Sequence, residues 1–203
     1  GSVGLDAAFT EEGTAGFAEA EPASLESLIE RMERDEFDLV AVGRALIANV
    51  MLRLFMDPLD CPFRAMDEVM ATATLGRDVQ AILVDMHGEA TSEKRAMGHF
   101  LDGRASLVVG THSHVPTADA HVMRGGTAYL TDAGMCGDYD SVIGMKKEAS
   151  ILRFRTKRPG ERLAPAEGEG ALAGVFVETD PATGLAREIR PFRRGFGVEA
   201  ADV

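Results

Sequence analysis

The sequence predicts an α/β fold, in which a sheet flanked by helices is followed by a C-terminal β-hairpin. Residues 79–84 and 105–109 are apolar runs with the composition of interior strands of a parallel sheet, which are apolar on both faces. Residues 92–101 between them have a helical pattern, and Gly103 ends that helix before the chain re-enters the sheet. Residues 180–184 (DPATG) are a turn sequence between two later strand patterns, which indicates the hairpin.

Before these strands, the sequence predicts a loop, a helix and a strand in that order. Residues 10–22 are rich in Gly, Ala and Glu and have little apolar content, which is typical of a loop. Residues 24–34 carry apolar side chains at helical spacing after a proline and a capping serine, so we expect an amphipathic helix that covers the sheet. Residues 38–42 are then expected to form a strand.

After the first two strands, the sequence predicts further strands separated by loops. Residues 158–170 are acidic, contain Gly and Pro and indicate an exposed loop. The expected strands are residues 127–130, 149–156, 171–178 and 185–191. Four arginines lie on the last strand or just after it. We interpret them as charges that protect a solvated edge strand, and the alternative is a strip that docks phosphate. These arginines are Arg187, Arg190, Arg193 and Arg194.

The composition is that of one compact unit. The chain has 203 residues, of which 45% are hydrophobic, and this is enough to fill a core. We expect neither membrane insertion nor secretion, because there is no long apolar run and no signal-peptide pattern, and we take the cytoplasm as the default location. Cys61 and Cys136 are far apart and are expected to be reduced thiols.

The net charge limits the partners that we expect. The formal charge of −12 argues against nonspecific binding to nucleic acid, because phosphate contacts need a basic surface that displaces counterions. A small phosphodiester remains an acceptable partner if metal ions make its pocket locally positive.

Three of the five histidines occur in two short blocks, each at the end of an apolar run. The blocks are residues 85–89 (DMHGE) and 110–114 (GTHSH), and they contribute His87, His112 and His114. Functional groups of parallel sheets gather just beyond the carboxyl ends of the strands, and imidazole is a good ligand for zinc, iron and manganese. A single histidine at such a place is usually a hydrogen-bonded structural residue, but the three together favour a metal site.

These blocks and their surroundings resemble the YmdB-like branch of the calcineurin-type metallophosphoesterases. The resemblance extends from about residue 50 to residue 196, and its specificity comes from five separated motifs that occur in order. The motifs are residues 55–64, 84–94, 109–120, 125–129 and 131–146. The resemblance implies that residues 50–203 form the C-terminal part of a metallophosphoesterase domain, that is, a partial metallophosphoesterase sandwich.

The resemblance also implies a function, the hydrolysis of a cyclic nucleotide or a similar phosphodiester by two bridged divalent ions, iron or manganese. The His87 and His112 positions belong to one ion and the His114 position to the other. Asp85 and Glu89 are candidates for positioning these ligands. Glu89 orients His87, acts as a proton shuttle or favours the amino end of the following helix. Asp85 supports a ligand or has a structural role at the strand end.

The sequence departs from the family pattern in the remaining ligands. The family also uses an aspartate, a glutamate-asparagine pair and an asparagine-histidine pair, whose histidine is the expected general acid. Asn49 is the single asparagine of the chain and no histidine precedes His87, so no Asn-His step occurs and we assign no catalytic residue. We therefore expect at most one bound ion. The alternative function is a noncatalytic fusion or remnant with a weak three-histidine metal site, unless a partner chain in an oligomer completes the site.

Residues 1–49 resemble a different family, the flavin oxidoreductases of the old yellow enzyme type. The motifs are residues 1–6 (GSVGLD) and 36–47 (EFDLVAVGRALI), which resemble the last strand-helix-strand unit of that barrel. Most strands of such a barrel are absent, so we expect no flavin binding and interpret the segment as structural. The predicted boundary between the two parts lies near Asn49.

Overall fold

The computed structural model describes residues 44–57, 59–158 and 160–196. They belong to one compact unit that begins at Gly43. The loop, helix and strand predicted for residues 10–22, 24–34 and 38–42 lie outside the described residues, and the resemblance of residues 1–49 to flavin oxidoreductases stays a prediction. No helix in the described part of the chain combines the length and apolar character that crossing a membrane requires.

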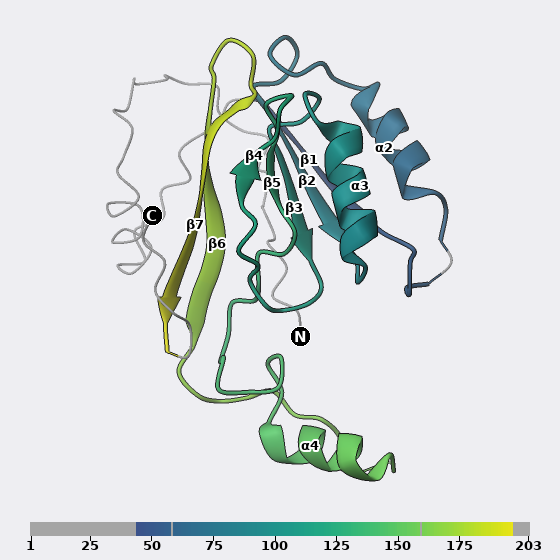
Figure 1. The fold of residues 1–203 in the computed structure, drawn as a ribbon, viewed down its shortest axis with the longest axis vertical. Helices are drawn as coiled ribbons and strands as arrows, with labels where there is room; N and C mark the ends of the chain where they lie inside the picture. Colours follow the sequence, from purple (N-terminus) through teal and green to yellow (C-terminus); the bar gives the residue numbers. More distant parts are fainter. Residues whose placement is uncertain (1–43, 58, 159, 197–203) are drawn as a thin grey trace, which may run out of the picture. The chain divides into compact units, whose positions relative to one another are not determined.

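A five-stranded sheet forms the centre of this unit, with strand order β1-β2-β3-β5-β4 (Figure 1). The strands are β1 (Ala45–Met51), β2 (Ala81–His87), β3 (Leu107–Thr111), β4 (His121–Val122) and β5 (Ala128–Leu130). All neighbouring pairs are parallel except β4 and β5. The predicted interior strands β2 and β3 are confirmed, and both are covered on their two faces.

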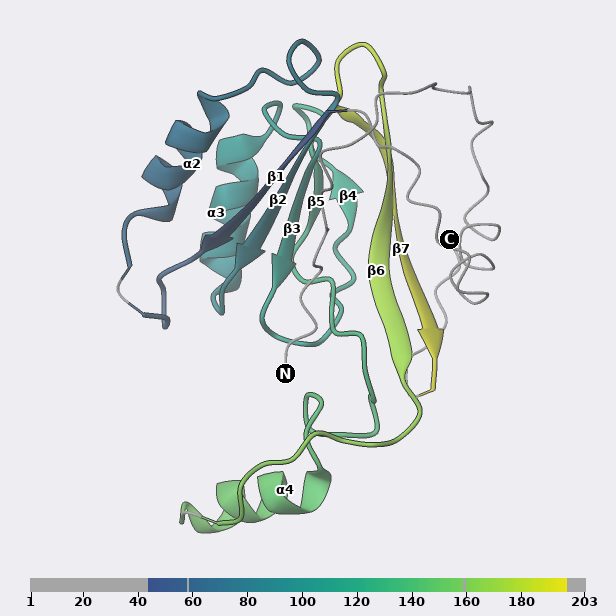
Figure 2. The ribbon, with the colours of Figure 1, turned by 180° about the vertical axis from the view of Figure 1, so that it is seen from behind.

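The helices α2 (Pro62–Met70) and α3 (Thr91–Leu101) cover one face of the sheet, and the hairpin β6–β7 lies on the other face (Figures 1 and 2). Alternate residues of each strand point to opposite faces. Val84 and Val108 therefore join a core cluster with Met97 of α3, whereas Leu107 and Val109 pack in a second cluster on the hairpin side. The α/β layering with a C-terminal hairpin is the predicted fold class.

The C-terminal hairpin consists of β6 (Ala171–Thr179) and β7 (Ala186–Gly195), which are antiparallel. Its turn is closed by two backbone hydrogen bonds, from the Asp180 amide to the Leu185 carbonyl and from the Gly184 amide to the Asp180 carbonyl, each 2.7 Å long. Gly184 has a φ of 72°, a conformation that glycine adopts without strain. The predicted turn at residues 180–184 is thus confirmed.

The strand predicted for residues 149–156 is wrong, because this segment is the helix α4 (Lys147–Thr156). Lys, Glu, Ala, Leu and Arg fill most of its positions, and all five are strong helix formers. The segment has no strand neighbour among the described residues, so nothing offsets that preference. Ser150 is its one buried residue, and Ile151, Leu152 and Phe154 are exposed.

The sequence did not predict β1, α2 or β4. Residues 45–51 (ALIANVM) are apolar except for Asn49, but they lie across the predicted boundary near Asn49, where no strand was expected. Asn49 lies inside β1 and pairs in regular register with Asp85 of β2. The predicted division of the chain near Asn49 therefore falls within a continuous strand, and that division stays a prediction.

Candidate metal centre

The histidine blocks meet where β2 and β3 end. His87 is the last residue of β2 and pairs in register with Thr111, the last residue of β3, and His112 follows Thr111 directly. Because neighbouring parallel strands end at the same edge of a sheet, both rings come from adjacent positions on that edge. Gly110 of β3 lies close to Thr131, the residue that follows β5. A Cβ at position 110 would lie 1.7 Å from the Thr131 carbonyl oxygen, so only glycine fits there.

The rings of His87 and His112 face each other through one nitrogen each. His87 Nε2 lies 3.2 Å from His112 Nδ1, and the ring planes are nearly perpendicular at 86°. Two imidazole nitrogens bound to one ion at about 2.0–2.1 Å are separated by about 3.0–3.4 Å at ordinary coordination angles. The observed separation lies in this range.

A chain of hydrogen bonds supports the other nitrogen of His87. Thr111 Oγ1 lies 2.8 Å from Asp85 Oδ1 and 3.0 Å from His87 Nδ1. An ionised carboxylate only accepts hydrogen bonds, so the Thr111 hydroxyl donates to Asp85 and accepts from the Nδ1–H of His87. This arrangement leaves the lone pair of His87 on Nε2, the nitrogen that faces His112. Asn49 Nδ2 donates to the second oxygen of Asp85 at 2.8 Å and holds that carboxylate in place.

Glu89 supports His112. Its Oε2 lies 3.0 Å from His112 Nε2, and it accepts the proton of that nitrogen, which leaves the lone pair on Nδ1. We expected Glu89 to orient His87, but Glu89 contacts His112 instead. Asp85 acts on His87 through Thr111. Metal-binding histidines in proteins commonly have their second nitrogen held by a carboxylate or another acceptor in this way.

The electrostatic surroundings favour a neutral imidazole at His87. Burial lowers the pKa of His87 from its usual value, and the adjacent His112 ring lowers it further. The neutral ring is the form that binds a metal ion, because the lone pair of the protonated form is occupied.

His114 does not join the other two rings. Its Nδ1 lies 2.9 Å from the carbonyl oxygen of Ile143, in the loop that precedes α4. No group of three or more His, Cys, Asp or Glu side chains in residues 44–57, 59–158 and 160–196 is arranged to hold a metal ion. His112 and His114 have φ angles of 109° and 63°, and this left-handed backbone turns the chain between them sharply. The structure thus brings together two of the three predicted ligands.

A buried ion pair fixes the loop that carries His112 and His114. Lys94 Nζ of α3 lies 2.9 Å from Asp132 Oδ2, and the two side chains are 2% and 1% exposed. Lys94 also donates to the Thr111 carbonyl at 2.8 Å, and Asp132 accepts the amide of Ser113 at 2.9 Å. The pair therefore holds the backbone on both sides of His112.

Sequence reasoning missed Lys94, Thr111 and Asn49 as parts of this site. A signal for Lys94 was present, because it lies three residues before Met97 and seven before Leu101, on the apolar face of the helix. A lysine at such a position is rarely buried without a carboxylate partner. No comparable pattern pointed to Thr111 or Asn49, whose positions become meaningful only once β1, β2 and β3 are aligned.

The chain is similar to several bacterial proteins over most of its length. It is 48% identical over 150 residues to the Bacillus subtilis protein named 2',3'-cyclic-nucleotide 2'-phosphodiesterase, an alignment of 73% of this chain and 56% of that protein. It is 41% identical over 120 residues to a putative phosphatase/phosphodiesterase of Mycoplasma pneumoniae, covering 59% of this chain and 41% of that protein. The chain thus spans about half the length of the curated relatives that it matches.

Two crystal structures have the same fold over three quarters of the chain. A hypothetical protein of Thermus thermophilus matches with a TM-score of 0.69 and 43% identity, over 74% of this chain and 57% of that one. A novel phosphatase of Mycoplasma pneumoniae matches with a TM-score of 0.65 and 33% identity, over 75% and 54%. The sequence model of the family described as YmdB-like protein matches residues 33–192. The chain therefore belongs to the YmdB-like protein family.

Proposed function

We propose that His87 and His112 bind one divalent ion, iron or manganese, in a site that hydrolyses a phosphodiester of the cyclic nucleotide class. The observation that carries this proposal is the pair of ring nitrogens 3.2 Å apart, with an acceptor at the second nitrogen of each ring. A proton or a metal ion between the two nitrogens satisfies both, and their separation suits two imidazoles bound to one ion. The donor set therefore fits a metal ion.

The residues around the two rings keep them ready for the ion. Thr111 and Glu89 fix the tautomers of His87 and His112, and Lys94 with Asp132 holds the backbone of the histidine loop. When bound, the ion neutralises charge that develops on the phosphoryl oxygens and lowers the pKa of a bound water. The names of the Bacillus subtilis and Mycoplasma pneumoniae relatives support phosphodiesters as the substrate class.

The alternative is a noncatalytic site that holds one ion weakly. It is favoured by the separation of His114, whose ring is directed to Ile143, and by the absence of an Asn-His step from the sequence. With one incomplete set of ligands, neither the activation of water nor the neutralisation of charge is complete. The two proposals agree on the ion at His87 and His112 and differ in the hydrolysis rate.

Titration of the metal-free chain with Mn²⁺, measured by calorimetry, tests whether an ion binds at His87 and His112, which both proposals require. We expect one site in the wild type and its loss in His87→Ala and His112→Ala. His99→Ala is the matched control, because His99 is an exposed histidine of α3 that has no part in the site. Equal Mn²⁺ binding by wild type and both site variants would refute the metal centre.

Hydrolysis of a 2',3'-cyclic mononucleotide by the same preparations distinguishes the two proposals. The phosphodiesterase proposal predicts a Mn²⁺-dependent rate that His112→Ala abolishes and His99→Ala retains. Mn²⁺ binding without any hydrolysis that depends on His112 would favour the noncatalytic site.

A further inference from the structure

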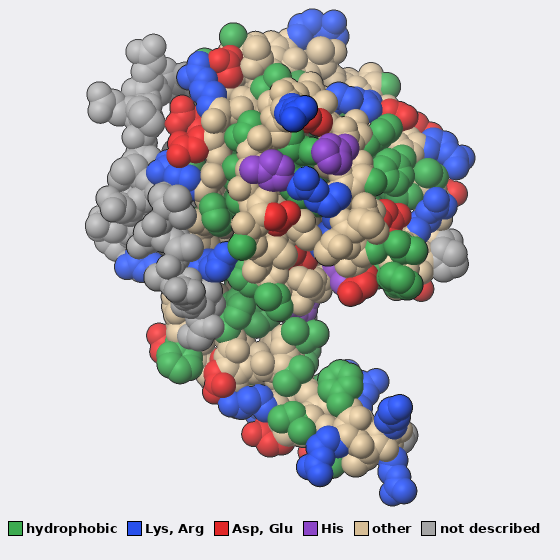
Figure 3. Space-filling model, in the orientation of Figure 1, with side chains coloured by type: hydrophobic (Ala, Val, Ile, Leu, Met, Phe, Trp, Pro, Cys, Tyr) green, Lys and Arg blue, Asp and Glu red, His purple; other side chains and the backbone are tan. Residues whose placement is uncertain are grey.

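The residues around α4 form a basic segment in an otherwise acidic protein. Residues 146–163, called here the basic arm, contain seven lysines and arginines and two glutamates, a formal charge of +5 in a chain whose total is −12. Figure 3 shows lysine and arginine side chains gathered around this helix. The charge of the protein is therefore distributed unevenly, and the total hides a local positive surface.

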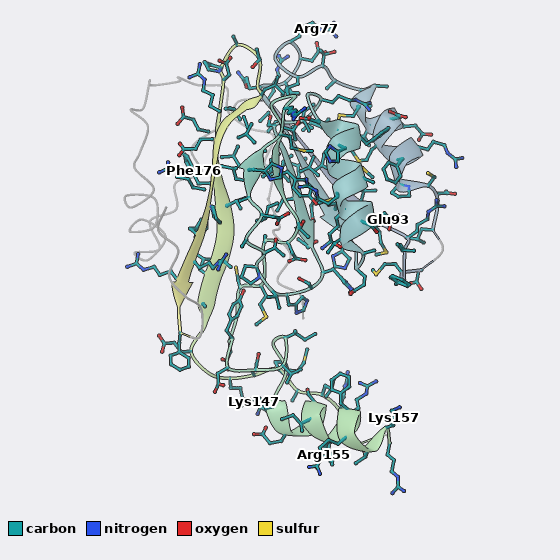
Figure 4. The ribbon with its side chains drawn as sticks, in the orientation of Figure 1. Arg77, Glu93, Lys147, Arg155, Lys157 and Phe176 are labelled. Atoms are coloured by element: carbon teal, nitrogen blue, oxygen red, sulfur yellow. The ribbon has the colours of Figure 1, made fainter. Side chains whose placement is uncertain are left out.

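Most cations of the basic arm have no carboxylate partner within the described part of the chain. Lys146 pairs with Glu167 and Lys147 with Asp140 at its start. No ion pair involves the other five cations among residues 44–57, 59–158 and 160–196, namely Arg153, Arg155, Lys157, Arg158 and Arg162. Figure 4 shows Arg155 and Lys157 extending away from α4. By contrast, Arg187 of β7 pairs with Asp180 at 2.6 Å.

Four of these cations line a hollow together with an exposed aromatic ring and one carboxylate, Glu161. The hollow has a volume of about 760 Å³, and its lining includes Arg153, Phe154, Lys157, Arg158 and Arg162. Phe154 is 76% exposed and lies on the same helix as the exposed Ile151 and Leu152, so α4 carries an exposed apolar group beside its cations. Cations that follow a phosphate backbone, together with an exposed ring on which bases stack, are the two features of surfaces that bind single-stranded nucleic acid.

The basic arm follows a loop that contacts His114, two residues after His112 of the histidine site. The carbonyl of Ile143 contacts the His114 ring, and α4 begins at Lys147, four residues later. Four residues span at most about 14 Å, and the six helical residues from Lys147 to Arg153 add about 9 Å. About seven nucleotides, at about 3.4 Å each along a stacked strand, cover this distance.

We propose that the basic arm binds the backbone of single-stranded RNA and presents its cyclic phosphodiester end to the histidine site. The proposal rests on the proposed phosphodiesterase function and specifies its substrate as the end of a strand. A 2',3'-cyclic phosphodiester requires a ribose 2'-hydroxyl, so the nucleic acid is RNA. The acidic remainder of the chain limits binding to the part of the strand that the arm contacts.

Binding of a fluorescently labelled ten-nucleotide RNA to the full chain, measured by anisotropy in EDTA at several salt concentrations, tests the proposal without requiring metal or activity. The arm variant combines Arg153→Glu, Arg155→Glu and Lys157→Glu. The control variant combines Arg64→Glu, Arg77→Glu and Arg124→Glu, which are exposed and make the same change in charge. A third variant, Phe154→Ala, removes the stacking surface and leaves the charge unchanged.

We expect the arm variant to lose at least about tenfold in RNA affinity, with the slope of log affinity against log salt reduced by about 2 for three lost phosphate contacts. Phe154→Ala should weaken binding about tenfold with an unchanged slope. Hydrolysis of a cyclic mononucleotide should be unaffected in both, so loss of RNA binding is distinguishable from failure of the proposed function.

Three results would overturn the proposal. One is the absence of RNA binding by the wild type at low salt, and another is an equal loss in the arm and control variants. The third is an unchanged RNA affinity combined with a lower mass by light scattering in the arm variant. This last result would mean that the arm, with its exposed Ile151 and Leu152, is an interface between copies of the chain.

Discussion

Replacing Lys94 with methionine is expected to destabilise the protein by about 3–5 kcal/mol, because it leaves the buried carboxylate of Asp132 without its counter-ion. Both side chains are almost completely buried, and their charged atoms are 2.9 Å apart. Asp132 keeps hydrogen bonds from the amides of Ser113 and Gly134, so the carboxylate is not left without any donor. Methionine has a similar length, so the change removes the charge and leaves little empty volume.

Chemical denaturation, monitored by circular dichroism, measures this loss of unfolding free energy. For a chain of this length, each kcal/mol corresponds to about 2–4 °C in Tm, so the expected decrease is about 6–20 °C. Arg95→Met is the matched control on the same helix. Arg95 is 40% exposed and lies 4.0 Å from Asp119, so its loss should cost less than about 1 kcal/mol. A loss below about 1 kcal/mol in Lys94→Met would refute the role assigned to the buried pair.

Three further predictions concern the site, the close strand contact and the hairpin. Thr111→Val removes a hydroxyl from the hydrogen-bond chain of the site and should weaken Mn²⁺ binding by about 10–100-fold. Thr111→Ser keeps the hydroxyl and should retain the affinity. Equal Mn²⁺ affinities of the two variants in calorimetry would contradict the role of Thr111. Gly110→Ala should prevent stable folding, since the new Cβ would lie 1.7 Å from a carbonyl oxygen, whereas Gly137→Ala, with nothing within 4 Å, should leave Tm nearly unchanged. Arg187 lowers the pKa of Asp180 to about 2, so the stabilisation from this carboxylate is present above its unfolded pKa of about 4 and is lost as the pH falls towards 2. The difference in unfolding free energy between wild type and Asp180→Asn should therefore be constant above pH 5 and shrink below pH 4, and a difference that does not change between pH 6 and pH 2 would contradict it.

The parts of the fold that the sequence predicted correctly are those in which local pattern and packing agree. The runs at residues 79–84 and 105–109 are apolar because both faces of β2 and β3 are covered, so composition alone identifies them. The helix α4 was assigned as a strand because its apolar residues do not form one stripe. These residues are exposed, and no core enforces a helical pattern on them.

The candidate site was predictable to the extent that the strand ends determine it. His87 and His112 meet because adjacent parallel strands end at one edge, and their positions follow from the runs before them. The direction of His114 depends on two left-handed residues in a loop, for which the sequence holds no periodic signal. The contact between Glu89 and His112 likewise arises from the tertiary structure, since these residues lie on segments that follow different strands.

The proposed metal centre requires that His87 Nε2 and His112 Nδ1 share one ion. Anomalous scattering from a crystal of the chain grown with Mn²⁺ tests it most directly. We expect a manganese peak within about 2.0–2.3 Å of both nitrogens. A manganese peak elsewhere in the chain, or none at these two rings at saturating Mn²⁺, would contradict it.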